Sequence, residues 1–319
     1  MSMAQALVQV RDLAKHYAAA GKRVVHAVDG VSLAVARGET LGLVGESGCG
    51  KSTLARLICC LERPTNGEVL FKGIETQAIS SRELRALHPR MQLIFQDPFS
   101  SLNPHKTVAQ IIALPLHIGR YGSKAAIQAR VCELLDMVGL DPSQATRFPH
   151  QFSGGQRQRI AVARALACAP ELIVADEPVA SLDVSIQAQI LQVMRRLQQR
   201  FRLTSIFISH DVSVVSHVSQ RIAVMYLGKI VEIGPTESVI ARPLHPYPRA
   251  LLAAVPRLDR RSREDSVLLS GDPPNPMTIP RGCRFHTRCY LDQTPECRRA
   301  EPALREIRPA HFAACHLAG

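Results

Sequence analysis

Apolar and polar positions alternate over the first part of the chain, which is the pattern of strands. The alternation is clear in Ala6–Val10, and a second stretch rich in β-branched residues runs from Val24 to Val35. A fully apolar run at Thr40–Val44 follows and ends at a glycine-rich turn. These segments predict a β-rich region over residues 6–35, followed by a buried strand.

Beyond this turn, apolar residues recur at helical spacing and alternate with further short apolar runs. The helix predicted from Lys51 has its apolar residues on one face, at Leu54, Leu57, Ile58 and Leu61. Residues 100–168 are mainly helical in pattern, with a second apolar face from Ile127 to Val138. Apolar runs at 172–175 and 205–208 then flank a helical segment whose apolar positions are Ile186, Ile190, Val193 and Leu197.

Strands that alternate with amphipathic helices predict an α/β fold, with a mostly parallel sheet covered on both faces. We expect the core domain over residues 5–240, with a helical subdomain at about 100–168. The composition changes near Arg242, because from there to the end the chain has thirteen arginines and no lysine. We expect residues 241–319 to form a small, irregular C-terminal extension.

A net charge of +12 over 319 residues raises the question of a nucleic-acid partner. Aromatic residues make up only 4% of the chain and there is no tryptophan, so few side chains are available to stack on bases. We expect no nucleic-acid partner. No stretch approaches the ~20 apolar residues of a membrane span, and the N-terminus lacks the layout of a secretory signal. The sequence therefore predicts a protein kept on the cytoplasmic side.

One segment has the spacing of a phosphate-binding loop, G-x-x-x-x-G-K-S, between a predicted strand and a predicted helix. Its glycines let consecutive backbone N–H groups point inward around an anion, and the helix dipole adds to the attraction. Lys51 is expected to bridge the β- and γ-phosphates of ATP, and Ser52 to bind Mg²⁺. The predicted ATP-binding residues are Gly45, Glu46, Ser47, Gly48, Cys49, Gly50, Lys51, Ser52 and Thr53.

Two adjacent carboxylates follow the apolar run Leu172–Ala175. Neighbours on an extended segment point in opposite directions, so the two side chains can have separate roles. We predict that Asp176 orients Mg²⁺ and that Glu177 is the general base that polarises the attacking water. Alone, this would be a solvated acidic pair at a strand end; with the phosphate loop, it indicates ATP hydrolysis.

A further segment, Phe152–Arg159, reads F-S-G-G-Q-R-Q-R. It resembles the LSGGQ signature of the ABC (ATP-binding cassette) ATPase family, with phenylalanine in place of leucine. A serine hydroxyl and glycine N–H groups at a helix start form a second anion cradle. The resemblance implies that two cassettes face head to tail, so that each ATP lies between one phosphate loop and the partner's signature. The signature residues are Ser153, Gly154, Gly155 and Gln156.

Four other positions resemble those of the family. Gln96 is similar to the glutamine that contacts Mg²⁺ and senses the membrane subunit, and His210 to the switch histidine that contacts the γ-phosphate. Asp183, in A-S-L-D where the family usually has S-A-L-D, resembles the D-loop aspartate. Tyr17 resembles the aromatic residue that stacks on adenine, the alternative being a surface aromatic on an edge strand. The implied catalytic residues are Glu177, His210 and Gln96; the implied Mg²⁺ ligands are Ser52, Gln96 and Asp176.

Two segments, Phe95–Pro104 and Leu244–Leu252, resemble the branch of dipeptide, oligopeptide and nickel importers, and most of all its dipeptide ATP-binding subunits. This implies an ATPase at the cytoplasmic face of the inner membrane, peripherally bound to two permease subunits. It also implies a second, distinct ATPase subunit and, indirectly, an extracytoplasmic solute-binding protein. The sequence does not decide between a peptide, nickel or another small solute.

The last four cysteines follow the spacing C-x5-C-x7-C-x17-C. Many members of the branch that this chain resembles carry a 4Fe–4S cluster in the same region, and four thiolates suit such a cluster, although His286 or His316 could replace one of them. Zinc and free buried thiols are the alternatives, although structural zinc sites favour closer C-x2–4-C pairs. The cysteines are Cys283, Cys289, Cys297 and Cys315.

Three classes of function remain in view. The first is the ATP-driven motor of an importer. The second is a soluble ABC ATPase of translation or chromosome maintenance, which usually has two cassettes or long coiled coils, and this chain shows neither. The third is a catalytically silent cassette, against which the intact Glu177 and His210 argue. We expect the motor.

Overall fold

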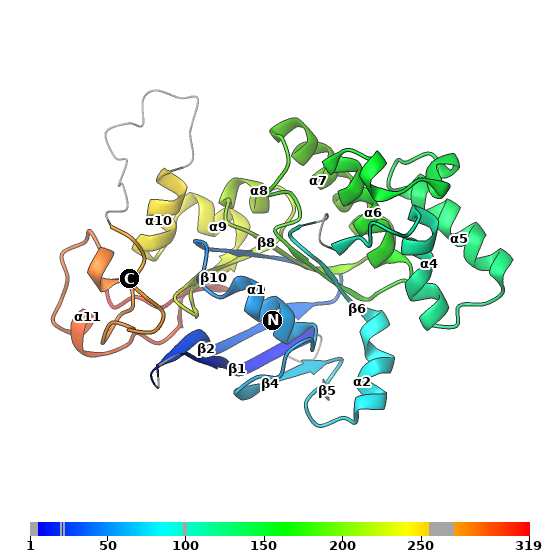
Figure 1. The fold of residues 1–319 in the computed structure, drawn as a ribbon. Helices are drawn as coiled ribbons and strands as arrows, with labels where there is room; N and C mark the ends of the chain where they lie inside the picture. Colours follow the sequence, from blue (N-terminus) through cyan, green and yellow to red (C-terminus); the bar gives the residue numbers. More distant parts are fainter. Residues whose placement is uncertain (1–5, 20, 22, 98–100, 255–270) are drawn as a thin grey trace. The chain divides into compact units, whose positions relative to one another are not determined.

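The computed structural model describes residues 6–19, 21, 23–97, 101–254 and 271–319. The chain divides into two compact units (Figure 1). The first comprises the described residues up to Val35, residues 40–77 and residues from 208 on; the second comprises residues 36–39 and 78–207. Residue 5 of the expected core domain, and residues 98–100 of the segment Phe95–Pro104, lie outside the described residues.

The first unit contains a four-stranded sheet in the order β2-β1-β4-β5. β1 pairs antiparallel with β4, and β4 pairs antiparallel with β5. This sheet confirms the β-rich start predicted from the alternating residues. Its strands are β1 (Ala6–Ala18), β2 (Val24–Ala36), β4 (Asn66–Phe71) and β5 (Ile74–Glu75).

A second set of strands in this unit has the order β11-β12-β10-β9-β3. They are β3 (Thr40–Val44), β9 (Arg221–Tyr226), β10 (Lys229–Pro235), β11 (Arg305–Arg308) and β12 (His311–Ala313). β3 and β9 run parallel and every residue of β3 is buried, which explains the fully apolar run. The pairs β9–β10, β10–β12 and β11–β12 are antiparallel. The expected irregular extension is therefore wrong in part, because β11 and β12 continue the sheet.

The helices of the first unit are short. They are α1 (Lys51–Ile58), α8 (Val212–Ser216), α9 (Thr236–Ala241), α10 (Pro246–Ala253), α11 (Glu296–Arg299) and a 3₁₀ turn at His286–Arg288. The predicted position of Leu61 on the apolar face of α1 is wrong. The helix stops at Ile58, Cys60 adopts a left-handed φ of 57°, and Leu61 lies beyond it with half of its surface exposed.

The second unit has strands in the order β8-β7-β6, and β6 and β7 run parallel. They are β6 (Met91–Ile94), β7 (Leu172–Asp176) and β8 (Thr204–Ser209), the last two residues of which are counted with the first unit. Its helices are α2 (Ser81–Leu87), α4 (Val108–Ile118), α5 (Lys124–Met137), α6 (Gly154–Leu166) and α7 (Val184–Phe201), with 3₁₀ turns at His88–Arg90, Pro142–Thr146 and Pro149–Gln151.

Helices α4, α5 and α6 pack on one another within this unit (Figure 1). The apolar face predicted for α5 is buried, from Ile127 to Leu135. All three helices lie within the stretch expected to be helical, between residues 108 and 166. No helix within the described ranges has the length and apolar character needed to cross a membrane.

Aromatic side chains attach the C-terminal extension to the sheet of the first unit. Phe285 of the extension meets Tyr226 of β9 edge to face, with ring centroids 5.3 Å apart, and Tyr247 of α10 at 5.5 Å. The rings of Tyr226 and Tyr247 are 4.7 Å apart. All three side chains are almost fully buried. Each such aromatic pair stabilises the fold by about 0.5–1.5 kcal/mol beyond the stabilisation from burying its apolar surface.

A buried carboxylate joins three elements of the same region. Glu232 of β10 accepts backbone N–H groups from Leu244 and His245, and its other contact is Nε2 of His311 on β12, at 2.7 Å. Burial raises the pKa of Glu232 against the effect of these donors. Because a buried carboxylate is costly unless hydrogen-bonded, the three donors fix how α10 and β12 pack on β10.

His245 predicts a pH dependence of folding stability. The side chain is fully buried, its Nδ1 accepts the N–H of Tyr247, and burial lowers its pKa to about 3. In the unfolded chain the pKa is about 6.5, so as pH falls below this value only the unfolded state takes up the proton. The contribution of neutral His245 to the free energy of unfolding is fully present above pH ~6.5. It falls by up to about 1.4 kcal/mol per pH unit toward pH 3.

Replacing His245 by Asn keeps an acceptor for the helix N-cap and removes the titrating ring. Urea denaturation between pH 7 and pH 5 is expected to show a shallower loss of stability in His245→Asn than in the unmodified chain. The exposed His105 is the control, since His105→Asn should leave the slope unchanged. Equal slopes for all three proteins would contradict this role of His245.

Candidate nucleotide-binding and hydrolysis site

The phosphate loop connects β3 to α1, and two of its glycines are required by close approach to neighbouring strands. Gly50 has a φ of 107°, and a Cβ there would lie 1.9 Å from the carbonyl oxygen of Ala27. A Cβ on Gly45 would lie 2.2 Å from the carbonyl oxygen of Met225. Any other residue would push the loop away from β2 and β9, so the cradle depends on the missing side chains.

Lys51 folds back into the loop that precedes it. Its Nζ donates hydrogen bonds to the carbonyl oxygens of Gly45 (2.7 Å) and Glu46 (2.9 Å), and only 4% of the residue is exposed. No acidic residue lies in the first turn of α1. The positive end of the helix dipole and the ammonium group therefore attract an anion to the same place.

Glu46, within the loop, is held by two residues of the C-terminal part of the chain. Its backbone N–H donates to the hydroxyl of Tyr247 at 2.8 Å. Arg288 donates two hydrogen bonds to its carboxylate, at 2.7 and 3.0 Å. The pKa of Arg288 is raised, chiefly by these bonds. Sequence reasoning missed both contacts, and no local pattern signals them, because the partners lie more than 200 positions away.

Tyr17, the predicted adenine-stacking residue, lies near the end of β1 and is partly buried. Its hydroxyl donates to the carboxylate of Glu62 and also interacts with Thr53 of α1. Burial and Glu62 raise the pKa of Tyr17. The ring is thereby placed beside the helix that follows the phosphate loop, and its stacking role stays a prediction.

The second unit holds the two predicted acidic residues at the end of β7. Asp176 is buried with 6% exposed, and Glu177 follows it with a φ of 46°, in the left-handed region that side chains rarely adopt. Gln96, after β6, donates from Nε2 to the carboxylate of Glu177 at 3.2 Å. Strained backbone of this kind is typical of active sites. The structure thus brings together two of the three residues predicted to be catalytic.

The signature segment forms the start of α6. Ser153 is the N-cap: its hydroxyl accepts the N–H of Gln156, and the Gln156 side chain accepts the N–H of Ser153. A Cβ on Gly155 would lie 2.4 Å from the Cγ2 of Ile186 on α7, so this glycine allows the two helices to pack closely. Phe152, in place of the family's leucine, is 5% exposed and anchors the segment.

The last two predicted residues lie at element ends. Asp183 is the exposed residue that begins α7, and it is followed by Val184, which is 81% exposed. His210 follows β8 in the first unit, and its side chain is exposed. The first unit thus carries the phosphate loop, Tyr17 and His210, and the second carries Gln96 with the acidic pair, the signature and Asp183.

The four C-terminal cysteines interact electrostatically. Burial raises the pKa of Cys283 to about 11, and the charges of Cys315, Cys297 and Cys289 add to the rise. The peptide N–H of Leu317 donates to the sulfur of Cys315 at 3.4 Å. Among the described residues, no three cysteine sulfurs lie within 4.8 Å of one another.

Comparisons with known families and structures show what this chain is similar to. The family described as ABC transporter matches residues 28–180, and the family described as oligopeptide/dipeptide transporter, C-terminal region, matches residues 231–297. The oligopeptide transport ATP-binding protein AppF of Bacillus subtilis (strain 168) is 48% identical over 322 residues, which cover 98% of each chain.

Two solved structures share the fold. One is a dimeric post-hydrolysis state of the ATP-binding cassette MJ0796 bound to ADP and Pi, with a TM-score of 0.66 and 32% identity over 72% of this chain and 98% of that one. The other is cbiO1 from Clostridium perfringens, part of the ABC transporter complex cbiONQ, with a TM-score of 0.67 and 26% identity over 75% of this chain and 92% of that one.

Fold and site together define an ATP-hydrolysing P-loop cassette. The chain belongs to the family of ABC transporter ATP-binding proteins, in the branch that carries the oligopeptide/dipeptide transporter C-terminal region.

The contact between Tyr247 and the phosphate loop predicts an effect on nucleotide affinity. Tyr247→Phe removes only the oxygen that accepts the N–H of Glu46, so a loop residue loses one hydrogen bond. Such a bond contributes ~1 kcal/mol, and ATP affinity should fall by about five-fold. Equilibrium binding of ATP measures the change. Tyr121→Phe, at an exposed tyrosine of the second unit, should bind ATP as the unmodified chain does.

Proposed function

We propose that this protein is the ATP-hydrolysing subunit of a multi-subunit ABC importer of dipeptides or oligopeptides. The observation that carries the proposal is the 48% identity to an oligopeptide transport ATP-binding protein over nearly the whole of both chains, C-terminal region included. In this proposal the ATPase domain comprises residues 5–240 and the extension comprises residues 241–319. ATP binding closes two cassettes on each other, and hydrolysis reopens them.

Exposed apolar side chains on the second unit support docking to membrane permease subunits. Phe95 lies after β6, and Leu114, Ile118 and Tyr121 lie on α4 and just beyond it; each exposes between 40% and 73% of its surface. Exposed apolar side chains are typical of interaction surfaces. Phe95 directly precedes Gln96, so contact with a permease subunit at Phe95 can reach the residue that contacts Glu177. The protein would then sit peripherally on the cytoplasmic face of the inner membrane.

A second cassette is the other partner that the chain needs. The N-terminus of α6 presents Ser153 at the surface, and its peptide N–H groups suit the γ-phosphate of an ATP held by another chain. Val184, four-fifths exposed beside Asp183, is an apolar group that a partner would cover. We propose that this partner is a distinct paralogue. We also propose that Ser52, Gln96 and Asp176 of this chain bind Mg²⁺.

Glu177→Gln tests the hydrolytic assignment. The amide keeps the shape of the side chain and the contact with Gln96, but it cannot accept a proton from the attacking water. ATP turnover by the assembled complex should fall by about 10²–10⁴-fold, while ATP binding is retained. Phosphate release and equilibrium ATP binding measure the two effects.

Glu75→Gln, at an exposed carboxylate of β5, is the matched control and should keep full turnover. Unchanged turnover in Glu177→Gln would show that the general base is another group. Purification of the tagged chain from detergent-solubilised membranes tests the wider proposal, which requires that permease subunits accompany it. Recovery with ribosomes or chromosomal DNA would refute an importer.

The residues of the extension fit a 4Fe–4S cluster, and we propose that they hold one. Backbone N–H groups two residues further along donate to the sulfurs of Cys283, Cys289 and Cys315, which is the kind of contact that stabilises thiolates bound to iron. A single zinc ion, with bonds of ~2.3 Å, would require sulfurs ~3.8 Å apart, which is closer than any three described cysteines come. When bound, the cluster would supply one-electron chemistry.

Cys289→Ser tests the cluster independently of transport. The unmodified protein, purified without oxygen, should contain about four iron and four acid-labile sulfide per chain, and the variant should lose most of both. Cys132→Ser, on α5, should keep the full content. Zinc without sulfide in the unmodified protein would refute the cluster and leave the ATPase proposal standing.

A further inference from the structure

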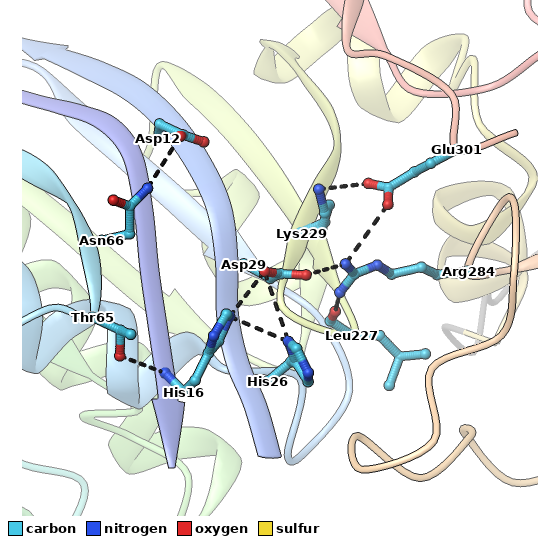
Figure 2. Close-up of polar contacts among 10 residues, drawn as sticks. All are labelled: Asp12, His16, His26, Asp29, Thr65, Asn66, Leu227, Lys229, Arg284 and Glu301. Atoms are coloured by element: carbon cyan, nitrogen blue, oxygen red, sulfur yellow. Dashed lines mark hydrogen bonds and ion pairs between the residues drawn. The ribbon is translucent and has the colours of Figure 1, made fainter. Parts of the chain in front are cut away.

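Three side chains with metal-binding chemistry meet on β1 and β2, outside the residues assigned to the nucleotide (Figure 2). Nε2 of His16 lies 2.9 Å from Oδ1 of Asp29 and 3.2 Å from Nδ1 of His26, and the last two atoms are 3.8 Å apart. Within the described ranges, this is the only group of three histidine, cysteine or carboxylate ligands that lies within 4.8 Å.

The two ligands on β2 meet although their spacing is not that of side chains on one face of a regular strand. His26 and Asp29 are three positions apart, so a regular strand would direct them to opposite faces of the sheet. Gly30, next in the chain, has a left-handed φ of 73°, so β2 departs from regular strand geometry beside Asp29. His26 and Asp29 both contact His16, and Figure 2 shows both rings directed at Asp29.

The carboxylate of Asp29 is oriented by Arg284, which lies outside β1 and β2. Arg284 donates to Oδ2 of Asp29 and also to the carbonyl of Leu227, which leaves Oδ1 toward the histidines (Figure 2). The positive charge of Arg284 and that of Lys229 are offset by Glu301, at 3.7 and 2.5 Å. Burial raises the pKa of Asp29, but the hydrogen bonds from Arg284 and His16 outweigh it and lower the pKa to about 2.

The spacing of the three atoms suits a metal ion. Ligand atoms around a tetrahedral ion with bonds of 2.0–2.1 Å lie ~3.3 Å apart, within the 2.9–3.8 Å range found here. The side chains are 24–34% exposed, so an ion and its water ligands can reach them.

We propose that His16, His26 and Asp29 form a binding site for a divalent transition-metal ion, Zn²⁺ in particular. Two imidazoles and one carboxylate are a donor set that suits zinc, with water completing the coordination. Arg284 acts as the group that orients the carboxylate ligand.

An ion bound here would link β1, the strand that carries Tyr17, to the neighbouring strand β2. His16 precedes Tyr17 in β1, and its backbone N–H donates to the hydroxyl of Thr65 at 3.0 Å. A metal bond from His16 to two residues of β2 restricts the movement of β1 at this point. The site therefore lies where an ion can stiffen the part of the sheet next to Tyr17.

Cobalt provides a probe that separates this site from the cysteines. Co²⁺ bound to imidazole and carboxylate gives visible d–d bands without the near-ultraviolet charge-transfer band of a thiolate ligand. Untagged full-length protein, purified without oxygen, is titrated with Co²⁺ and then with Zn²⁺. One equivalent of Co²⁺ per chain should develop these bands, and Zn²⁺ should remove them.

His26→Gln should weaken Co²⁺ binding by at least about ten-fold, because His26 is a direct ligand. His105→Gln, at an exposed histidine of the second unit, should bind Co²⁺ with unchanged affinity. Thermal denaturation of metal-free protein checks that both variants are folded, and Asp29→Asn gives a second variant with the same expected loss. Bands that persist in both ligand variants, a thiolate band, or no binding at all would overturn the proposal.

Discussion

The structure of the first unit depends on how closely the phosphate loop is pressed against its surroundings. Gly45 lies against the carbonyl of Met225 on β9, and Gly50 against that of Ala27 on β2, at distances that leave no space for a side chain. Strands from both sheets of the unit thus set the curvature of the loop. Because the loop cannot relax outward, Lys51 stays folded back on the carbonyl oxygens of Gly45 and Glu46, next to the positive N-terminus of α1.

The C-terminal extension is part of this support. The aromatic cluster of Tyr226, Tyr247 and Phe285 attaches the extension to β9, and from there Tyr247 and Arg288 reach the loop residue Glu46. Arg288 is one position before Cys289, so the proposed iron–sulfur module and the phosphate loop are joined by one short chain of contacts. Disorder in the iron–sulfur module would therefore weaken the contacts that support the phosphate loop.

Other features of the chain fit the proposed assembly with partner subunits. The second unit holds Glu177 in a left-handed conformation and fixes its side chain with Gln96, as the proposed general base at the end of β7 requires. The same unit presents the signature at the N-terminus of α6 and leaves Val184 and Ile118 largely exposed. Exposed apolar groups are costly in an isolated protein, and a second cassette and the permease subunits would cover them.

The sequence by itself determined what depends on neighbouring residues. Alternation predicted β1 and β2, helical spacing predicted α5, and the glycine spacing located the phosphate loop, since each is a property of a short segment. Tertiary structure decided the rest: that α1 ends before Leu61, that β11 and β12 extend the sheet, and that residues 201 and 242 positions away hold Glu46. It also brought His16 to Asp29. Contacts between distant positions depend on which strands pair and on how the elements pack, and no single short segment encodes either.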